Sequence, residues 1–142
     1  MTPQERAEKS ASAMMQNDET LRWMGMSLDS VGEGTAVMSM TVEKQHCNGH
    51  GITHGGMTFA LADTAFAYAC NSRNQVTVAQ HNLISYLAPG KLGDRLTATA
   101  VEVKAGRSGI YDVTVVNQDG KVIAEFRGFS RSIEGTLFKE DE

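Results

Sequence analysis

The stretch that most constrains the fold runs from residue 48 to residue 72 and reads NGHGITHGGMTFALADTAFAYACNS. Its first half is a loop rich in glycine and histidine. Its second half predicts one long helix that is apolar on nearly every side, so more than one surface must bury it. One carboxylate, Asp63, interrupts this helix, and a charged group in such a segment is costly unless it is paired or used.

The segments around this helix have the patterns of strands: residues alternate in 36–41 and 96–103, and 110–116 is rich in β-branched residues. A short helical lead over residues 3–24 is expected to begin at Thr2, followed by Pro3 and Glu5. The expected strands are 26–31, 36–41, 76–87, 96–103, 110–116 and 122–130, and Asp119-Gly120 predicts a hairpin turn into the last of them. A polar tail from Gly135 is expected to be frayed.

A long central helix bracketed by antiparallel strands is an α+β layout. The chain of 142 residues is expected to form a single domain, residues 1–142. One sheet covers only one side of the helix, and a second subunit is the simplest cover for the rest.

Composition excludes several classes of function. The formal net charge of −4 argues against non-specific nucleic-acid binding, which needs a basic surface. No apolar run approaches the length of a membrane span, and the N-terminal residues lack the apolar core of a secretory signal. The two cysteines, Cys47 and Cys70, are interpreted as unpaired thiols in a reducing cytoplasm.

Familiar catalytic motifs are absent. His46, His50 and His54 have helical spacing, but glycines within the stretch disfavour a helix there, and no carboxylate has the spacing of a zinc-protease motif, so no metal is expected. The glycines of GHGITHGG are spaced too widely for a dinucleotide fingerprint, and GFSRS lacks the second glycine of a serine-hydrolase elbow. No cofactor is predicted.

The strongest candidate site combines the start of the helix with its carboxylate. The N–H groups of Gly55 and Gly56 are expected at the positive end of the helix, where they suit a developing oxyanion. Asp63 lies eight residues further on, about 12 Å along the axis, too far to share a substrate with the Gly55 N–H of its own chain. A joint site therefore predicts a dimer, although Asp63 as a satisfied structural carboxylate remains an equal alternative.

Neighbouring polar residues have two interpretations each. Thr64 either holds the carboxylate or a water, or returns a hydrogen bond to a helix carbonyl. Asn48 either orients a carbonyl or water, or caps a turn. Four basic residues near the expected strand ends could meet an anionic group, although a solvated charge is the usual role of each: Lys91, Arg95, Lys104 and Arg107.

Three motifs, NGH at 48–50, HGG at 54–56 and LADTAFAYACNS at 61–72, resemble the hotdog-fold acyl-CoA thioesterases, specifically those of phenylacetic-acid degradation. The resemblance extends roughly from residue 20 to residue 133. It implies a central helix wrapped by a curved antiparallel sheet of about five to six strands. It also implies dimers that pair into a homotetramer, and cytoplasmic hydrolysis of acyl-CoA or aryl-CoA thioesters.

The resemblance also implies residue roles. Asp63 is the expected general base or nucleophile, and Gly55 supplies the N–H that polarises the thioester carbonyl across the dimer. Asn48 and Thr64 are the implied supports, while His54 and Gly56 shape the turn.

One departure concerns the CoA contacts. Related proteins often carry a basic residue before the PG at 89–90, where this chain has Ala88. Lys91, Arg95 or Arg107 would have to replace a phosphate contact from that position.

Two alternatives on the same fold differ in chemistry. A hotdog hydratase or dehydratase needs a histidine paired with a carboxylate, which His54 and Asp63 could mimic. It would interconvert enoyl and hydroxyacyl groups instead of releasing a thiol. A non-catalytic acyl-CoA-binding protein would be expected to carry an effector segment.

Overall fold

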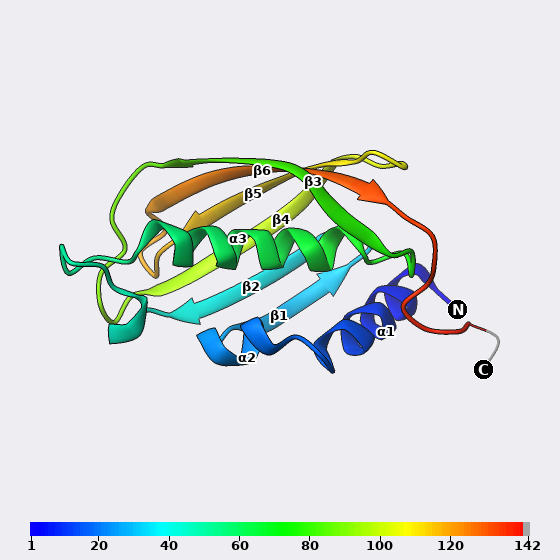
Figure 1. Cartoon of the computed structure of the whole chain (residues 1–142), viewed down its shortest axis with the longest axis horizontal. Helices are drawn as coiled ribbons and strands as arrows, with labels where there is room; N and C mark the ends of the chain where they lie inside the picture. Colours follow the sequence, from blue (N-terminus) through cyan, green and yellow to red (C-terminus); the bar gives the residue numbers. More distant parts are fainter. Residues whose placement is uncertain (141–142) are drawn as a thin grey trace.

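The computed structural model describes residues 1–140 of the chain. Its helices are α1 (Pro3–Met15), α2 (Glu19–Met24) and α3 (Gly55–Cys70), with a 3-10 turn, η1 (Lys44–His46). Its strands are β1 (Ser27–Gly32), β2 (Thr35–Thr41), β3 (Thr77–Tyr86), β4 (Arg95–Lys104), β5 (Ile110–Val116) and β6 (Val122–Ser132). Figure 1 shows α3 lying along one side of the sheet, with α1 and α2 beside β1.

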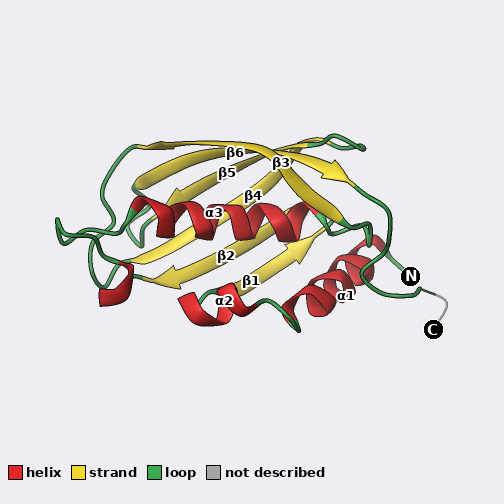
Figure 2. Ribbon diagram, in the orientation of Figure 1, coloured by secondary structure: helices red, strands yellow, loops and turns green. Residues whose placement is uncertain are grey.

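The sheet has the strand order β1-β2-β4-β5-β6-β3 and wraps around α3 (Figure 2). Every pair of neighbours in it is antiparallel. After β2 the chain forms α3, adds β3 at the far edge, and returns to place β4 beside β2. The predicted α+β hotdog layout is therefore confirmed, with six strands.

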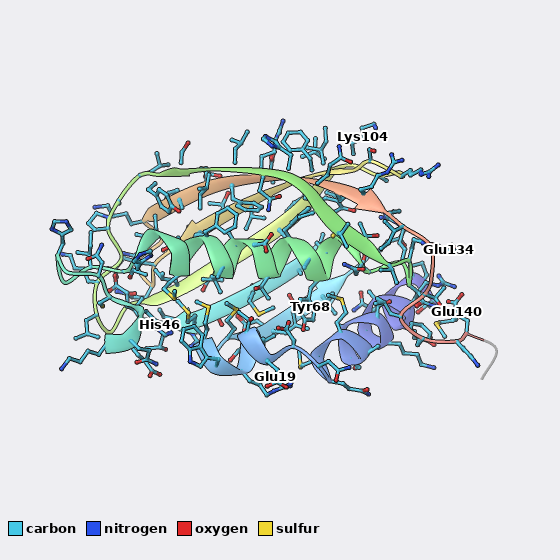
Figure 3. All side chains as sticks on the ribbon, in the orientation of Figure 1. Glu19, His46, Tyr68, Lys104, Glu134 and Glu140 are labelled. Atoms are coloured by element: carbon cyan, nitrogen blue, oxygen red, sulfur yellow. The ribbon has the colours of Figure 1, made fainter. Side chains whose placement is uncertain are left out.

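The core lies between α3 and the concave face of the sheet. Phe66 packs against the rings of Tyr111 and Phe126, with centroids 5.6 and 5.8 Å away. A Cβ atom added at Gly128 of β6 would lie 2.7 Å from the Phe66 ring, so a side chain there would push the helix off the sheet. Tyr68 lies on another side of α3 (Figure 3). Its hydroxyl donates at 3.0 Å to Asp18, the N-cap of α2.

One side of α3 is not fully covered by the rest of this chain. Five of its partly exposed positions recur at a spacing of three or four residues, which places them on one helix face. We call this face the Asp63 stripe; it comprises Met57, Ala60, Asp63, Thr64 and Ala67. The expectation that one sheet leaves part of the helix uncovered is confirmed.

The two edges of the sheet differ in how they are protected. Along β1, the Gln4 amide of α1 donates to the Val31 carbonyl at 2.8 Å. β3 forms the other edge, and most of its residues are exposed. Its pairing with β6 shifts between Ala79 and His81, which leaves Gln80 as a β-bulge.

The helical lead begins as predicted, because Thr2 Oγ1 accepts the Glu5 N–H at 3.1 Å and Pro3 opens α1.

The prediction of a frayed tail is wrong for residues 135–140. The Asn74 side chain accepts the N–H groups of Leu137 and Phe138 at 2.9 and 3.0 Å and donates to the Phe138 carbonyl at 2.9 Å. Residues 141–142 of that expected tail lie outside the described residues.

No helix within residues 1–140 is long and apolar enough to span a membrane.

Candidate active site

The start of α3 leaves one backbone donor free. His54 is the N-cap, and its Nδ1 accepts the Gly56 N–H at 2.8 Å. The N–H groups of Met57 and Thr58 donate to the His54 carbonyl at 2.9 and 3.3 Å. Among the described residues, the Gly55 N–H has no acceptor, so of the two glycines singled out by the sequence only Gly55 offers its N–H to a ligand.

Gly55 lies at the wall of a surface groove. The groove has a volume of about 500 Å³ and is lined by residues that include Asn48, Gly55, Tyr86 and Ala88. The Tyr86 hydroxyl donates to the Gly55 carbonyl at 2.9 Å. A Cβ atom at Gly55 would lie 3.1 Å from Tyr86 Cζ, so the glycine lets this ring approach the helix start. The positive end of the helix therefore opens into a space large enough for part of a ligand.

Asn48 holds the loop that precedes the helix. Its Oδ1 accepts the backbone N–H groups of His50 and Ile52 at 2.9 and 3.4 Å. This is the turn-capping arrangement, the second of the two roles considered for Asn48. Asn48 also lines the groove, so the capped turn forms part of its wall.

Asp63 lies in the middle of α3 with one hydrogen-bond partner. The Asn82 amide of β3 donates to Asp63 Oδ1 at 3.0 Å. Burial raises the pKa of the Asp63 carboxyl above its ordinary value, and the hydrogen bond from Asn82 opposes that rise. Within residues 1–140 no basic side chain forms an ion pair with Asp63. A desolvated carboxylate of this kind is a candidate base or nucleophile.

Thr64 does not contact Asp63 through its hydroxyl. Thr64 Oγ1 donates to the Ala60 carbonyl at 2.7 Å, one helical turn back. This is the second role considered for Thr64. Its side chain still shares the Asp63 stripe, so it borders the surface on which the carboxylate lies.

The predicted site residues fall into separate places in this chain. Lys91 lies next to the groove, because it forms an isolated β-bridge with Ile52. Arg107 follows the far end of β4, and its carbonyl accepts the Ser132 N–H at 2.8 Å. Ten residues of β4 span about 30 Å, so Lys91 and Arg107 lie at opposite ends of the sheet.

The other basic residues that were considered for an anionic group form hydrogen bonds outside the groove. Arg95 donates to the Thr41 and Ser39 hydroxyls at 2.9 and 2.7 Å. Lys104 donates to the Ser108 carbonyl at 3.2 Å. Ala88 lines the groove, and its backbone N–H donates to the Ile123 carbonyl at 3.2 Å.

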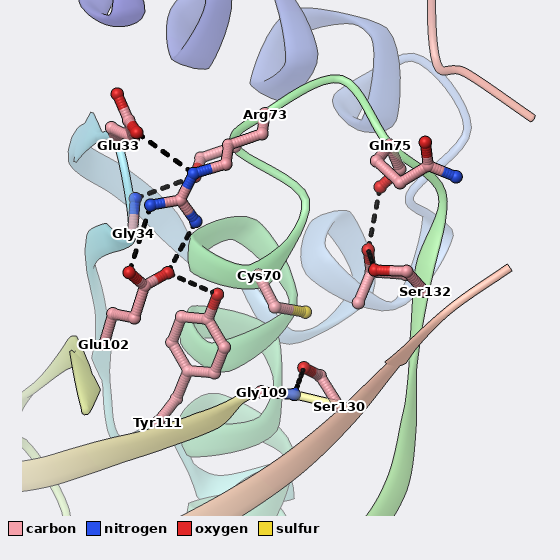
Figure 4. Close-up of polar contacts among 12 residues, drawn as sticks. Glu33, Gly34, Cys70, Arg73, Gln75, Glu102, Gly109, Tyr111, Ser130 and Ser132 are labelled. Atoms are coloured by element: carbon pink, nitrogen blue, oxygen red, sulfur yellow. Dashed lines mark hydrogen bonds and ion pairs between the residues drawn. The ribbon is translucent and has the colours of Figure 1, made fainter. Parts of the chain in front are cut away.

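The far end of α3 carries a second, fully paired polar cluster (Figure 4). Arg73 donates to both oxygens of Glu102 at 2.6 and 3.0 Å and to Glu33 at 3.0 Å. The Tyr111 hydroxyl donates to Glu102 at 2.7 Å. Arg73 lowers the pKa of Glu102 below its ordinary value against the effect of burial. This cluster links the β1–β2 turn, β4 and β5 to the end of the helix, and each of its charged groups has an oppositely charged partner.

The histidine and cysteine residues do not form a metal site. Within residues 1–140, no group of three or more His, Cys, Asp or Glu side chains is arranged to hold a metal ion. His46 is buried, and its Nδ1 accepts the Glu43 N–H at 2.9 Å. Both cysteines are free, and burial together with the charge of Asp63 raises the pKa of the Cys70 thiol to about 12. A thiol of that kind stays protonated at neutral pH.

Two residues near the site were not singled out by the sequence. Asn82 contacts Asp63, and Tyr86 contacts Gly55. The available signal for Asn82 was an amide inside a strand pattern, where asparagine is depleted. Tyr86 gave no signal, since tyrosine is common in strands.

Comparison with known proteins gives consistent matches. A model of the thioesterase superfamily matches residues 50–124. The chain is 48% identical to acyl-coenzyme A thioesterase PaaI of Escherichia coli over 136 residues, which are 95% of this chain and 97% of that protein. The structure of the E. coli PaaI protein from the phenylacetic acid degradation operon matches with a TM-score of 0.93 and 47% identity, covering 95% of this chain and 99% of that one.

A third match carries a bound thioester. A Streptococcus mutans protein bound to acetyl CoA matches with a TM-score of 0.75 and 28% identity. The match covers 78% of this chain and 90% of that one.

Proposed function

This chain belongs to the thioesterase superfamily and is a thioester hydrolase, and on that premise we propose that it hydrolyses phenylacetyl-CoA or ring-hydroxylated phenylacetyl-CoA to the free acid and CoA. The observation that carries the proposal is Asp63, a carboxylate in an apolar helix that has no ion pair with any residue the structure describes. The relationship to the E. coli acyl-CoA thioesterase, and that protein's place in a phenylacetic acid degradation operon, support the substrate class.

The proposed mechanism uses Asp63 and Gly55 on the same thioester. The free N–H of Gly55 donates to the thioester carbonyl oxygen and stabilises the negative charge that develops on it. Asp63 removes a proton from the attacking water, or attacks the carbonyl carbon and is later released by water. In both routes the C–S bond breaks, water supplies the acid's new oxygen, and the thiolate takes a proton to leave as free CoA.

The proposed working unit is a homodimer with shared sites. Asp63 and Gly55 of one chain are about 12 Å apart along the helix axis, so one chain alone does not bring them to one carbonyl. The Asp63 stripe and the exposed edge strand β3 are the surfaces that a second subunit would cover. In this arrangement the Gly55 N–H of one subunit meets the Asp63 carboxylate of the other.

The proposed assembly of dimers is a homotetramer in the cytoplasm. The convex face of the sheet, away from α3, is uncovered, and there Val101 and Val103 of β4 are 49% and 54% exposed. Exposed apolar side chains of this kind favour contact with another protein surface. The unpaired Cys47 and Cys70 are compatible with a reducing compartment.

CoA is proposed to enter through the groove beside Gly55. Lys91 borders this groove, so it is the proposed phosphate contact in place of a basic residue at Ala88. Arg107 would reach a CoA only from another subunit, because it lies at the other end of β4. The proposed support roles of Asn48, His54 and Gly56 are to hold the loop and the helix start that form the groove wall.

A panel of thioesters tests this function. Release of free thiol is measured with phenylacetyl-, hydroxyphenylacetyl-, benzoyl- and straight-chain acyl-CoAs, and kcat/KM is expected to be highest for the phenylacetyl group. Enoyl or hydroxyacyl products without thiol release would instead identify a hydratase. Within one chain His54 is not placed for that chemistry, because its Nδ1 accepts the Gly56 N–H and it lies nine residues before Asp63.

A further inference from the structure

The side chain that contacts Asp63 is an amide with an unsatisfied end. Asn82 Nδ2 donates to Asp63 Oδ1 at 3.0 Å. An ionised carboxylate only accepts hydrogen bonds, so the amide nitrogen must face it and the amide oxygen must face the other way. Asn82 Oδ1 is shielded from solvent and has no partner among the described residues.

A β-bulge turns Asn82 toward α3. Residues opposite each other in an antiparallel pair point to the same side of the sheet. Before the bulge, Ala79 pairs with the buried Ser130; after it, His81 pairs with Phe129 and packs against its ring with a centroid distance of 5.3 Å. The extra residue, Gln80, reverses the alternation, so position 82 faces the helix instead of the outside.

The partners further along the strand agree with this orientation. Asn82 pairs with Gly128, the glycine that lies against Phe66. Ile84 pairs with Phe126 and packs against the core. Without the bulge, the outward-facing set of β3 would include Asn82, and Asp63 would lose its donor.

We infer that Asn82 is a positioning residue that holds Oδ1 of Asp63, so that Oδ2 is the oxygen that takes the proton from water or attacks the thioester. Oδ2 has no hydrogen-bond partner among the described residues. This inference rests on the proposed catalytic role of Asp63. It holds for either route, because both need one carboxylate oxygen in a fixed direction.

The amide also has an electrostatic role. Burial raises the pKa of Asp63, and the Asn82 hydrogen bond acts in the opposite direction. A donor to the ionised form keeps more of the carboxylate in its reactive state at neutral pH. A side chain needed only for packing would be apolar here, because a half-satisfied buried amide costs stability.

The first test replaces the amide with an apolar side chain of similar size. Asn82→Leu is expected to lower kcat about tenfold, because it removes a hydrogen bond to a charged group. KM for phenylacetyl-CoA should remain within about twofold of the wild-type value. The acidic limb of the pH profile of kcat/KM should move to higher pH. The control is Gln80→Leu, which also replaces an amide by leucine on the same strand, at a residue that forms no hydrogen bond with Asp63 among the described residues; its acidic limb should not move.

A second variant keeps the test decisive if Asn82→Leu does not fold. Asn82→Asp preserves the size of the side chain but places a second carboxylate beside Asp63. The two would compete for ionisation, so the acidic limb should also move to higher pH. Circular dichroism and size-exclusion chromatography check that each variant is folded and assembled.

The outcomes separate this inference from the proposed function. Unchanged kcat and an unmoved acidic limb in a folded Asn82 variant would overturn the positioning role, as would a fall in kcat without movement of the limb. If Asp63→Asn retains thiol release, the proposed catalytic role of Asp63 fails, whereas absence of thiol release from every thioester by the wild type would reject the proposed function. If Asp63→Asn is inactive and the Asn82 variants behave like wild type, only the inference about Asn82 is rejected.

Discussion

Glu102 and Asp63 are two carboxylates in opposite environments. Glu102, near the end of α3, accepts two hydrogen bonds from Arg73 and one from Tyr111, and these donors hold its pKa below the ordinary value. Asp63, in the middle of α3, accepts one hydrogen bond from a neutral amide, and burial holds its pKa above the ordinary value. Both groups are held by the fold, but only one has its charge matched.

This difference in environment distinguishes a carboxylate that stabilises the fold from one that is available for reaction. A carboxylate surrounded by donors is stabilised in its ionised form and is a poor base. A desolvated carboxylate without a cation is less stable as an ion and a stronger base, at a cost to the stability of the fold. The same contrast holds for backbone donors at the helix start, where the Gly56 N–H is capped by His54 and the Gly55 N–H has no acceptor in the described part of the chain.

The largest effect is expected when the reactive carboxylate is neutralised. Asp63→Asn keeps the shape of the side chain and removes its basicity, so kcat/KM for phenylacetyl-CoA should fall on the order of 10³-fold. Thiol release monitored with a chromogenic reagent measures the loss. Glu102→Gln is the matched control and should retain activity within about threefold; an equal loss in both variants would break the distinction between the two carboxylates.

The next effect concerns the free N–H at the helix start. Gly55→Pro removes this donor, and proline is tolerated at the first position of a helix. The preceding His54 has ψ 132°, which suits a residue before proline. The expected loss in kcat is about 10²-fold.

Gly55→Ala is the control for the added carbon. Both substitutions place a Cβ atom about 3.1 Å from Tyr86, and only proline deletes the N–H. Alanine should therefore retain much more activity than proline. Equal activity of the two variants would show that the N–H is not used.

Stability should respond in the opposite sense to activity. Glu102→Gln is expected to lower the free energy of unfolding by about 1–2 kcal/mol at neutral pH, because it weakens the bonds to Arg73 and Tyr111. Asp63→Asn is expected to raise it slightly, because a buried ion becomes neutral. Thermal unfolding of both variants at neutral pH measures these two changes in stability. A destabilised Asp63→Asn variant would contradict the account.

The pH dependence of the free energy of unfolding gives the sign of each carboxylate's contribution to stability. The folded-state pKa of Glu102 is lowered, so its stabilisation is present above the unfolded-state pKa and disappears as pH falls through the folded-state pKa. The folded-state pKa of Asp63 is raised, so its destabilisation develops as pH rises from the ordinary aspartate pKa through the higher folded value. The difference in stability between wild type and each variant should follow these opposite directions.

The smallest effect is expected at the tail. Asn74 adopts a positive φ of 60°, and its side chain holds residues 137 and 138. Asn74→Gly keeps the backbone conformation accessible and removes the anchor, so the global stability should change by less than about 1 kcal/mol. Limited proteolysis should cut the tail faster in the variant, with activity unchanged; equal cleavage rates would show that Asn74 does not hold it.

The sequence predicted the features that depend on local patterns. Alternation, β-branched residues and turn signals marked the six strands, and the nearly all-apolar segment around Asp63 marked the central helix. The fold places Gly55 at the helix start and Asp63 within it, as expected. The roles proposed for these residues remain predictions.

The features that depend on long-range register were not visible in the sequence. The bulge at Gln80 leaves the run of strand residues unchanged but reverses which of them face α3, so Asn82 could not be assigned to Asp63. The separation of Lys91 and Arg107 depends on how the strands are ordered. The anchored tail depends on long-range contacts, among them the Asn74 side chain, which reaches residues more than sixty positions away.

The central claim is that two chains contribute to one site, and a mixture of two inactive variants tests it most directly. Gly55→Pro lacks the proposed donor, and Asp63→Asn lacks the proposed base. In a mixed dimer with shared sites, one site combines the intact Gly55 of one chain with the intact Asp63 of the other. Co-expressed chains that pair at random should therefore recover about a quarter of the wild-type activity. Recovery to that level, from two variants that are each inactive alone, is the predicted result, whereas a mixture as inactive as its components would contradict the shared site.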